Sequence, residues 1–120
     1  MEIRVYGYRG CSTCRRAYAF LKERGVAFTE VDVTEHPPTL PELRGMLAAL
    51  GGNVRKLFNT SGQVYRELRL GDQLADMPEK DALALLAGNG RLVKRPFLIV
   101  GGAPRTVGFT EEAWNQALDQ

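Results

Sequence analysis

The sequence predicts an α/β domain whose mixed sheet is flanked by helices and interrupted by a helical insertion. Two strand-like stretches, at 2–6 and 28–33, lie on either side of a stretch with helical periodicity. Near the other end, an apolar run at 97–100 precedes a second short strand and a helix. Most of residues 35–93, between these two parts, has a helical pattern. The expected order is therefore β-α-β, the insertion, and then β-β-α.

The N-terminal part is expected to form a strand, a helix and a second strand. Ile3 and Val5 alternate with polar neighbours, which is typical of a short strand. Apolar positions then recur at helical spacing from about Ser12 to Arg24, and Gly25 is a candidate C-cap. A helix of this length suits the crossover to a parallel strand at 28–33.

The insertion begins with a polar, proline-bearing loop at 34–41. An amphipathic helix over 40–50, closed by Gly51-Gly52, follows it. We expect a further helical turn at 54–58 and a short helix at 65–70. The last helix of the insertion should run from Pro78 to Ala87, because proline fits the first helical turn.

The C-terminal part begins at Pro96. The continuous apolar run at 97–100 is typical of a central strand that is covered on both faces. We expect Gly101 to Pro104 to turn the chain and 106–109 to form the partner strand. Thr110 can cap a last helix, whose apolar side carries Trp114.

Composition limits the class of protein. The chain has 120 residues, which suit one domain, and 16 basic against 14 acidic residues give a net charge of +2. This surplus is too small to predict direct binding of nucleic acid or of an anionic membrane. The N-terminus resembles a strand and not a signal peptide. We expect a cytoplasmic, monomeric protein.

The candidate reactive residues are Cys11 and Cys14, which form a C-x-x-C at the junction of the first strand and the first helix. Free N–H groups and the helix dipole stabilise a thiolate at a helix start. Cys14 is one turn further along on the same face, so the two sulfurs can meet. We expect Cys11 to attack and Cys14 to resolve the product. Nearby positive charge comes from Arg9, Arg15 and Arg16.

The cysteine pair has two other interpretations. A zinc site takes about four ligands, and His36 is the chain's one histidine, so no metal is expected. Both cysteines could instead simply pack against the helix. Their position between a strand and a helix favours the redox interpretation.

Arg95-Pro96 is a second candidate feature. Proline rarely opens an apolar central strand, because it cannot donate to the ladder. A cis bond here would present backbone to a bound thiol, although X-Pro bonds are trans in most cases. Taken alone, Arg95 would be a solvated arginine at the start of a strand.

Taken together, several segments resemble the arsenate reductase-like (ArsC) family, in the Spx/MgsR group of the thioredoxin fold. Val107-Gly108-Phe109 and the Trp114 helix fit the family's C-terminal end. The remaining segments are VYGYRGCSTCRRA at 5–17, LFNTSGQVYREL at 57–68 and LVKRP at 92–96. Resemblance extends over essentially the whole chain.

The resemblance implies a thioredoxin-like core with Cys11 as the nucleophile. It also implies that Pro96 is a cis-proline facing Cys11 and that Arg95 reaches the same site. Arg15 matches a family arginine four residues after the cysteine, so Arg15, Arg95 and Pro96 are expected to bind substrate or an anion. No bound cofactor is implied. Glutathione, glutaredoxin or thioredoxin would serve as reductant.

At two positions this sequence differs from the arsenate reductases that it resembles, and two functional hypotheses therefore remain. Gly7 occupies the position of a histidine, and Asn59 that of an arginine, which argues against arsenate as the physiological substrate. The first hypothesis is a thiol-dependent oxidoreductase, similar to arsenate reductases, that uses the C-x-x-C pair. The alternative is a redox-sensitive transcriptional regulator of the Spx type that binds the RNA polymerase α subunit.

Overall fold

The computed structural model describes residues 1–119. The elements follow the predicted order of β-α-β, helical insertion and β-β-α. They are β1 (Ile3–Gly7), α1 (Ser12–Glu23), β2 (Thr29–Asp32), α2 (Leu40–Ala49), the 3₁₀ turn η1 (Val54–Leu57), α3 (Gln63–Glu67), α4 (Leu70–Gln73), the 3₁₀ turn η2 (Leu74–Asp76), α5 (Glu79–Gly88), the 3₁₀ turn η3 (Gly90–Leu92), β3 (Phe97–Val100), β4 (Ala103–Val107) and α6 (Glu111–Leu118).

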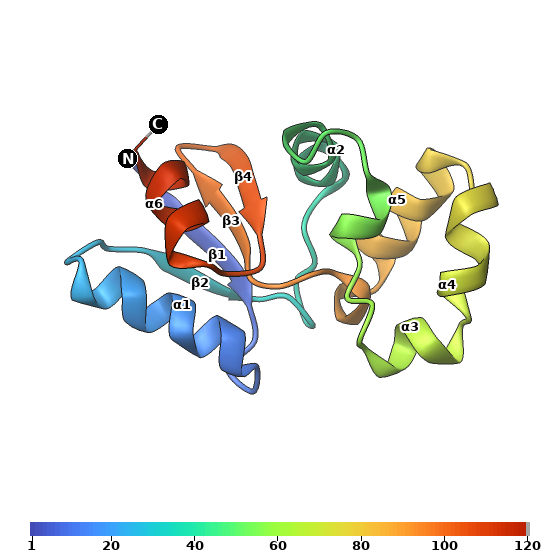
Figure 1. Ribbon diagram of the computed structural model, residues 1–120, viewed down its shortest axis with the longest axis horizontal. Helices are drawn as coiled ribbons and strands as arrows, with labels where there is room; N and C mark the ends of the chain where they lie inside the picture. Colours follow the sequence, from blue (N-terminus) through green and yellow to red (C-terminus); the bar gives the residue numbers. More distant parts are fainter. Residues whose placement is uncertain (120) are drawn as a thin grey trace.

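The strands form one mixed sheet in the order β2-β1-β3-β4 within residues 1–119. β1 pairs in parallel with β2 and antiparallel with β3, which in turn pairs antiparallel with β4. All four residues of β3 are buried, as the apolar run predicted. Figure 1 shows α1 and α6 beside the sheet at one end of the molecule and the insertion at the other.

The predicted bounds of the last hairpin were wrong. The turn contains only Gly101 and Gly102, whose φ angles of 58° and 79° fit a two-residue hairpin turn. β4 therefore starts at Ala103, three residues earlier than expected, and already ends at Val107.

The prediction placed Pro104 in the turn because proline usually interrupts the hydrogen-bond ladder of a sheet. Here it lies in the edge strand, next to a break in register at which Leu98 pairs with Thr106 and Ile99 with Pro104. Arg105 is thus the extra residue of a bulge. Edge strands and bulges are the places where a sheet tolerates proline.

Two apolar cores lie on opposite faces of the sheet. Val5 and Leu98 face α1 and α6, where Trp114 is fully buried and its Nε1 donates to the Gly108 carbonyl at 2.9 Å. Tyr6 and Phe97 face the other way, toward α2 and the rest of the insertion. The sheet is thus covered on both sides, although by different parts of the chain.

Glu42 fastens α2 to the sheet. Its carboxylate accepts from the Tyr6 hydroxyl at 2.8 Å and from the Arg4 guanidinium at 3.2 Å. The same carboxylate completes a capping box with Thr39 at the start of α2. Beyond α2, the insertion continues past the end of the sheet, which gives the molecule extents of 42 × 27 × 23 Å.

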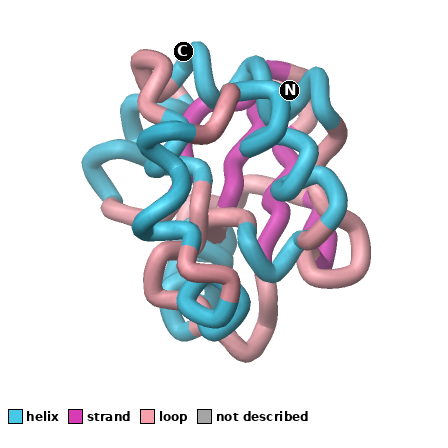
Figure 2. The backbone as a smooth tube through the Cα atoms, turned by 90° about the vertical axis from the view of Figure 1, so that its right-hand side faces the viewer, coloured by secondary structure: helices cyan, strands magenta, loops and turns pink. Residues whose placement is uncertain are grey.

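A short antiparallel contact joins two segments of the insertion, 57–59 and 92–94, just before the chain enters β3. The Asn59 N–H donates to the Leu92 carbonyl at 2.7 Å, and the Lys94 N–H donates to the Leu57 carbonyl at 2.8 Å. Seen from the insertion end, helices and loops lie in front of the strands (Figure 2). The contact holds the segment before β3 in place and so fixes where Arg95 lies. Within residues 1–119, no helix is both long and apolar enough to cross a membrane.

Candidate active site

Cys11 is the N-cap of α1. Its backbone is extended, and its Sγ accepts a hydrogen bond from the Cys14 N–H at 3.4 Å. Its own N–H donates to the Tyr8 carbonyl at 3.0 Å, which closes the turn after β1. Cys11 thus takes the part that serine or threonine plays at other helix starts. The predicted position of Cys11, just before the first turn of the helix, is confirmed.

The surroundings of Cys11 favour its thiolate. Partial burial opposes ionisation, but the Cys14 N–H, the Cys14 thiol and the Arg95 guanidinium together lower the pKa of Cys11 below its ordinary value. Cys11 is only half-buried, so the residue is not shut off from other molecules. A half-exposed thiolate beside a fixed cation is suited to nucleophilic attack.

Cys14 has the opposite character. Burial raises the pKa of its thiol to about 12, and the hydrogen bond to Cys11 acts in the same direction. The residue has no exposed surface. It therefore holds its proton while Cys11 is ionised, which is the division of roles expected of an attacking and a resolving cysteine.

Arg95 reaches Cys11 across the ring of Tyr8. Its guanidinium lies 5.2 Å from the ring centroid, and its positive charge helps to lower the pKa of Cys11. Gly10 makes room for this arrangement, since a Cβ at that position would collide with the Tyr8 ring. Arg95 is thus a half-buried site residue and not a freely solvated arginine.

The Arg95–Pro96 peptide bond is cis, as the resemblance implied. Pro96 is buried, and its carbonyl accepts from the Gly108 N–H at 2.8 Å. This bond joins the start of β3 to the turn after β4.

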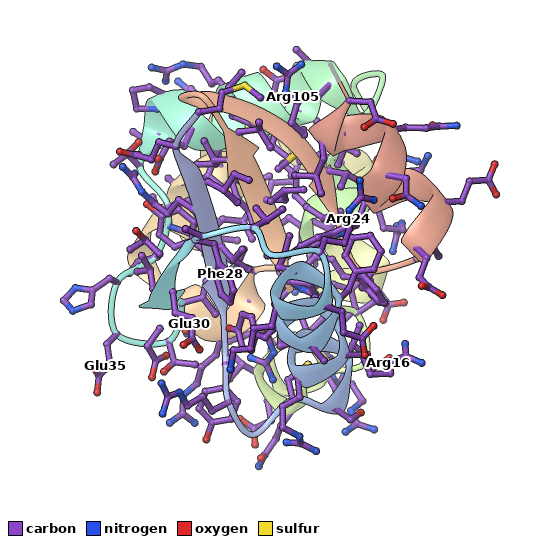
Figure 3. All side chains as sticks on the ribbon, turned by 90° about the vertical axis from the view of Figure 1, so that its left-hand side faces the viewer. Arg16, Arg24, Phe28, Glu30, Glu35 and Arg105 are labelled. Atoms are coloured by element: carbon purple, nitrogen blue, oxygen red, sulfur yellow. The ribbon has the colours of Figure 1, made fainter. Side chains whose placement is uncertain are left out.

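The other nearby arginines have different partners. Arg15 donates to the Arg9 carbonyl at 2.7 Å, and Arg9 forms an ion pair with Glu30 at 3.2 Å. The Arg16 guanidinium lies 5.9 Å from the Phe109 ring centroid. Figure 3 shows Arg16 on the outer side of α1 and Arg105 toward the opposite end of the sheet. The structure therefore brings Cys11, Cys14 and Arg95 together, while the contact found for Arg15 is with backbone.

Tyr18 occupies an apolar position of α1, but it also places a hydroxyl near the cysteine pair, which helical periodicity does not indicate. The ring is buried and stacks on Phe28 at 5.7 Å, as a core residue would. Its hydroxyl, however, occupies the space beside Gly7, where a Cβ would collide with it. The signal was present in Gly7, because the absence of a side chain there leaves room for another group.

A polar cavity of about 340 Å³ lies next to Arg95. It is lined mainly by residues of the insertion and has one acidic and two basic lining residues. Its lining consists of Tyr8, Thr34, Asn59, Gly62, Gln63, Val64, Glu67, Arg91 and Arg95. A small polar group attached to a substrate sulfur could bind here. Among residues 1–119, no three His, Cys, Asp or Glu side chains gather in a way that could hold a metal ion.

Known proteins share this architecture over nearly its whole length. The chain is 41% identical over 116 residues to the uncharacterized protein YusI of Bacillus subtilis, covering 97% of this chain and 98% of that protein. A crystal structure of an ArsC family related protein from Bacteroides fragilis superposes with a TM-score of 0.89 at 39% identity, covering 98% of both chains.

Relatives with assigned roles are more distant. The global transcriptional regulator Spx of Enterococcus faecalis is 29% identical, over 90% of this chain and 80% of its own. An arsenate reductase of Rhizobium meliloti is 30% identical, over 82% of this chain and 69% of its own.

The family itself is matched over residues 6–117, a range that includes the cysteine pair, the whole insertion and most of α6. By this match and by its mixed thioredoxin-like sheet, the chain belongs to the ArsC family.

Proposed function

We propose that the protein is a thiol–disulfide oxidoreductase in which Cys11 attacks and Cys14 resolves. One observation carries the proposal: two thiols one helical turn apart have pKa values displaced in opposite directions. The Cys11 thiolate is available to a substrate, and the Cys14 thiol is held in reserve behind it. Two cysteines that served only to pack a core would both be buried, and their pKa values would not be displaced in opposite directions.

The reaction balances as an exchange of one disulfide for another. The Cys11 thiolate attacks a disulfide RS–SR, forms a mixed disulfide and releases RS⁻. Cys14 then loses its proton and attacks the Cys11 sulfur, which forms the Cys11–Cys14 disulfide and releases the second RS⁻. The substrate gains two electrons, and the cysteine pair loses them. An external thiol, such as glutathione or the dithiol of glutaredoxin or thioredoxin, returns the pair to its reduced form.

Arg95 has two roles in this scheme. It stabilises the Cys11 thiolate before attack, and it faces the 340 Å³ cavity, where a carboxylate or another anionic group of the substrate could bind. An arsenate oxyanion would need several fixed donors. Asn59 lines the cavity at the position where the resemblance expects an arginine, so one such donor is missing. We therefore favour a disulfide over arsenate as the substrate class.

The test is the rate of Cys11 alkylation by iodoacetamide as a function of pH, in a Cys14→Ser background that leaves one thiol. We expect a midpoint below the free value of about 8.5. Arg95→Gln should move the midpoint up toward that value. Arg24→Gln is the matched control, because Arg24 lies over Phe20, where it has no role in the site.

The Arg15→Gln variant, measured in the same alkylation assay, shows whether Arg15 acts on Cys11. The resemblance places Arg15 at the anion site, whereas its observed contact is with the Arg9 carbonyl. An unchanged midpoint would agree with the observed contact. A midpoint at or above the free value in the Cys14→Ser background, together with no Cys11–Cys14 disulfide in the wild type after peroxide treatment, would contradict the proposed function.

A second candidate is a redox-sensitive regulator that binds the RNA polymerase α subunit. It is supported by the 29% identity to Spx over 90% of this chain, together with the C-x-x-C pair. Retention of purified α subunit on immobilised protein, reduced and oxidised, tests it. Retention that differs between the two states supports a switch, and absence of retention in both states excludes it.

Turnover assays distinguish the substrate classes. We expect reduction of a model disulfide in the presence of glutathione and glutaredoxin, or of thioredoxin, to exceed reduction of arsenate under the same conditions. The need for such reductants agrees with a cytoplasmic location. We propose that the monomer is the active form, since both cysteines and Arg95 come from one chain.

A further inference from the structure

The resolving step requires a path for a proton. If the proposed exchange is correct, Cys14 must lose its proton before it attacks the mixed disulfide at Cys11. Cys14 has no exposed surface, so bulk water does not reach its sulfur directly. Neither neighbour of Cys14 can accept this proton, because Cys11 is part of the mixed disulfide at that stage and Arg95 is a cation.

Tyr18 lies where such a group is needed. A Cβ built on Gly7 would collide with the Tyr18 hydroxyl and would lie 3.4 Å from the Cys14 Sγ. The hydroxyl and the sulfur therefore share the small space beside the end of β1. Stacking on Phe28, with an interplanar angle of 12°, holds the ring in this position.

Tyr18 also lines a cavity. Gly7, Tyr18 and Glu30 are among the residues around this space of about 270 Å³ on the β2 side of α1. Figure 3 shows Phe28 just before β2 and Glu30 in β2, both beside α1. The Glu30 side chain is 31% exposed and pairs with Arg9 at 3.2 Å. Tyr18 and the partly exposed Glu30 carboxylate thus line the same cavity, together with Asp32.

The charges around Tyr18 keep its hydroxyl protonated. Burial raises the pKa of Tyr18 first, and the negative charges of Cys14 and Cys11 on α1 and of Glu30 on β2 raise it further. Arg9, in the loop before α1, opposes them. A neutral hydroxyl can accept one proton while it donates its own, whereas a phenolate could not donate.

We propose that Tyr18 is a proton-relay residue between Cys14 and Glu30. As the Cys14–Cys11 S–S bond forms and the bond from Cys11 to the substrate sulfur breaks, the Cys14 proton passes to the Tyr18 oxygen. The hydroxyl's own proton passes to the Glu30 carboxylate in the cavity, and the departing RS⁻ takes a proton from solvent. Tyr18 and Glu30 return to their starting states when Glu30 releases its proton to water.

Stopped-flow reaction with the chromogenic disulfide dithiobis-nitrobenzoate separates the steps. Attack by Cys11 releases the first thionitrobenzoate, and resolution by Cys14 releases the second. In Tyr18→Phe we expect an unchanged first phase and a second phase slowed by about 10²-fold, the lower range for general acid–base catalysis. The rate of the second phase should also rise only at higher pH than in the wild type, because the proton must then leave without the relay.

Glu30→Gln tests the other end of the relay. Its second phase should also be slowed, and Glu30→Asp should recover part of the lost rate. Tyr65→Phe is the matched control: it also loses a buried tyrosine hydroxyl, but one that accepts from Arg55 within the insertion. Both phases should be unaffected there.

The outcomes separate this inference from the function on which it rests. A second phase with wild-type rate and pH profile in both Tyr18→Phe and Glu30→Gln overturns the relay and leaves the exchange reaction standing. Release of only one thionitrobenzoate by the wild type, as expected of Cys14→Ser, overturns the exchange reaction itself. If the Tyr18→Phe variant no longer unfolds cooperatively on heating, the relay is tested by Glu30→Gln alone, because Glu30 is partly exposed and its replacement should leave the fold intact.

Discussion

Cys11 and Cys14 are separated by one turn of α1, yet their thiols have opposite surroundings. The sulfur of Cys11 meets a backbone N–H and a guanidinium at the half-exposed helix start. That of Cys14 points into the core between α1 and the sheet. At this scale, reactivity depends on neighbours that are distant in sequence, above all Arg95, which is held over Tyr8.

The ring of Tyr8 is expected to matter through Arg95. Tyr8→Ala should release the guanidinium and reduce the thiolate fraction of Cys11 at neutral pH by about two- to fivefold. This is the size expected of an exposed cation–π contact of about 0.5–1 kcal/mol. Tyr8→Phe keeps a ring and should behave like the wild type. Cys11 alkylation rates measure the effect, and equal losses in the two variants would contradict a role for the ring.

The buried thiol of Cys14 should make stability depend on pH. Its pKa is raised to about 12 in the folded chain, so between about pH 8.5 and 10 the unfolded chain ionises this thiol while the folded chain does not. The unfolded state then binds fewer protons, and the free energy of unfolding falls as pH rises. The stabilisation is fully present below about pH 8.5.

Urea denaturation of the reduced protein at several pH values measures this effect. Cys14→Ala removes the titrating group, so its stability should decline less steeply over the same range. Cys11 remains in that variant and contributes with the opposite sign, since its lowered pKa makes stability rise with pH below about 8.5. Parallel curves for the wild type and Cys14→Ala would argue against a buried, protonated Cys14.

At the scale of elements, the insertion is joined to the sheet at defined contacts. Glu42 fastens the start of α2, and the 57–59 and 92–94 segments pair where the insertion ends. Gly90, which opens η3, packs so closely on the end of β2 that a Cβ there would collide with the Val33 carbonyl. This contact also fixes the chain direction toward Arg95.

Gly90→Ala is expected to destabilise the protein by about 1–3 kcal/mol, the usual cost of overpacking, because the colliding atoms are backbone and cannot rotate away. Gly88→Ala is the matched control, since a Cβ there meets nothing within 4 Å and alanine favours the helix end at which it lies. Chemical denaturation compares the two. Similar stabilities for both variants would show that η3 moves freely against β2.

At the scale of the molecule, one sheet separates two cores. Trp114 lies in the core under α1 and α6, and Leu86 of α5 lies in the core shared with the insertion. The middle strands β1 and β3 contribute side chains to both. We therefore expect the chain to unfold as one cooperative unit despite its elongated shape.

Leu86→Ala tests this cooperativity. Removing a fully buried leucine should cost about 2–5 kcal/mol. Fluorescence of Trp114, the chain's one tryptophan, follows the far core, while far-UV circular dichroism follows all helices. Both signals should shift together. Leu68→Ala is the control, because Leu68 is 46% exposed. A shift in circular dichroism without a shift in fluorescence would show that the insertion unfolds alone.

Local periodicity, together with turn and cap residues, was enough to predict the element order, the central position of 97–100 and the place of the cysteines. It could not place the last hairpin, since only pairing with β3 shows that Pro104 is accommodated at an edge bulge. Helical periodicity near Cys11 pointed only to Arg9, Arg15 and Arg16, and it was the family resemblance that implied Arg95. The tertiary structure decides the matter, because the chain that leaves the insertion brings Arg95 to Cys11, and α1 brings Tyr18 to the space left by Gly7. Periodicity is a property of neighbouring residues, but the electrostatics of a thiol depend on whatever the fold brings within a few ångströms of it.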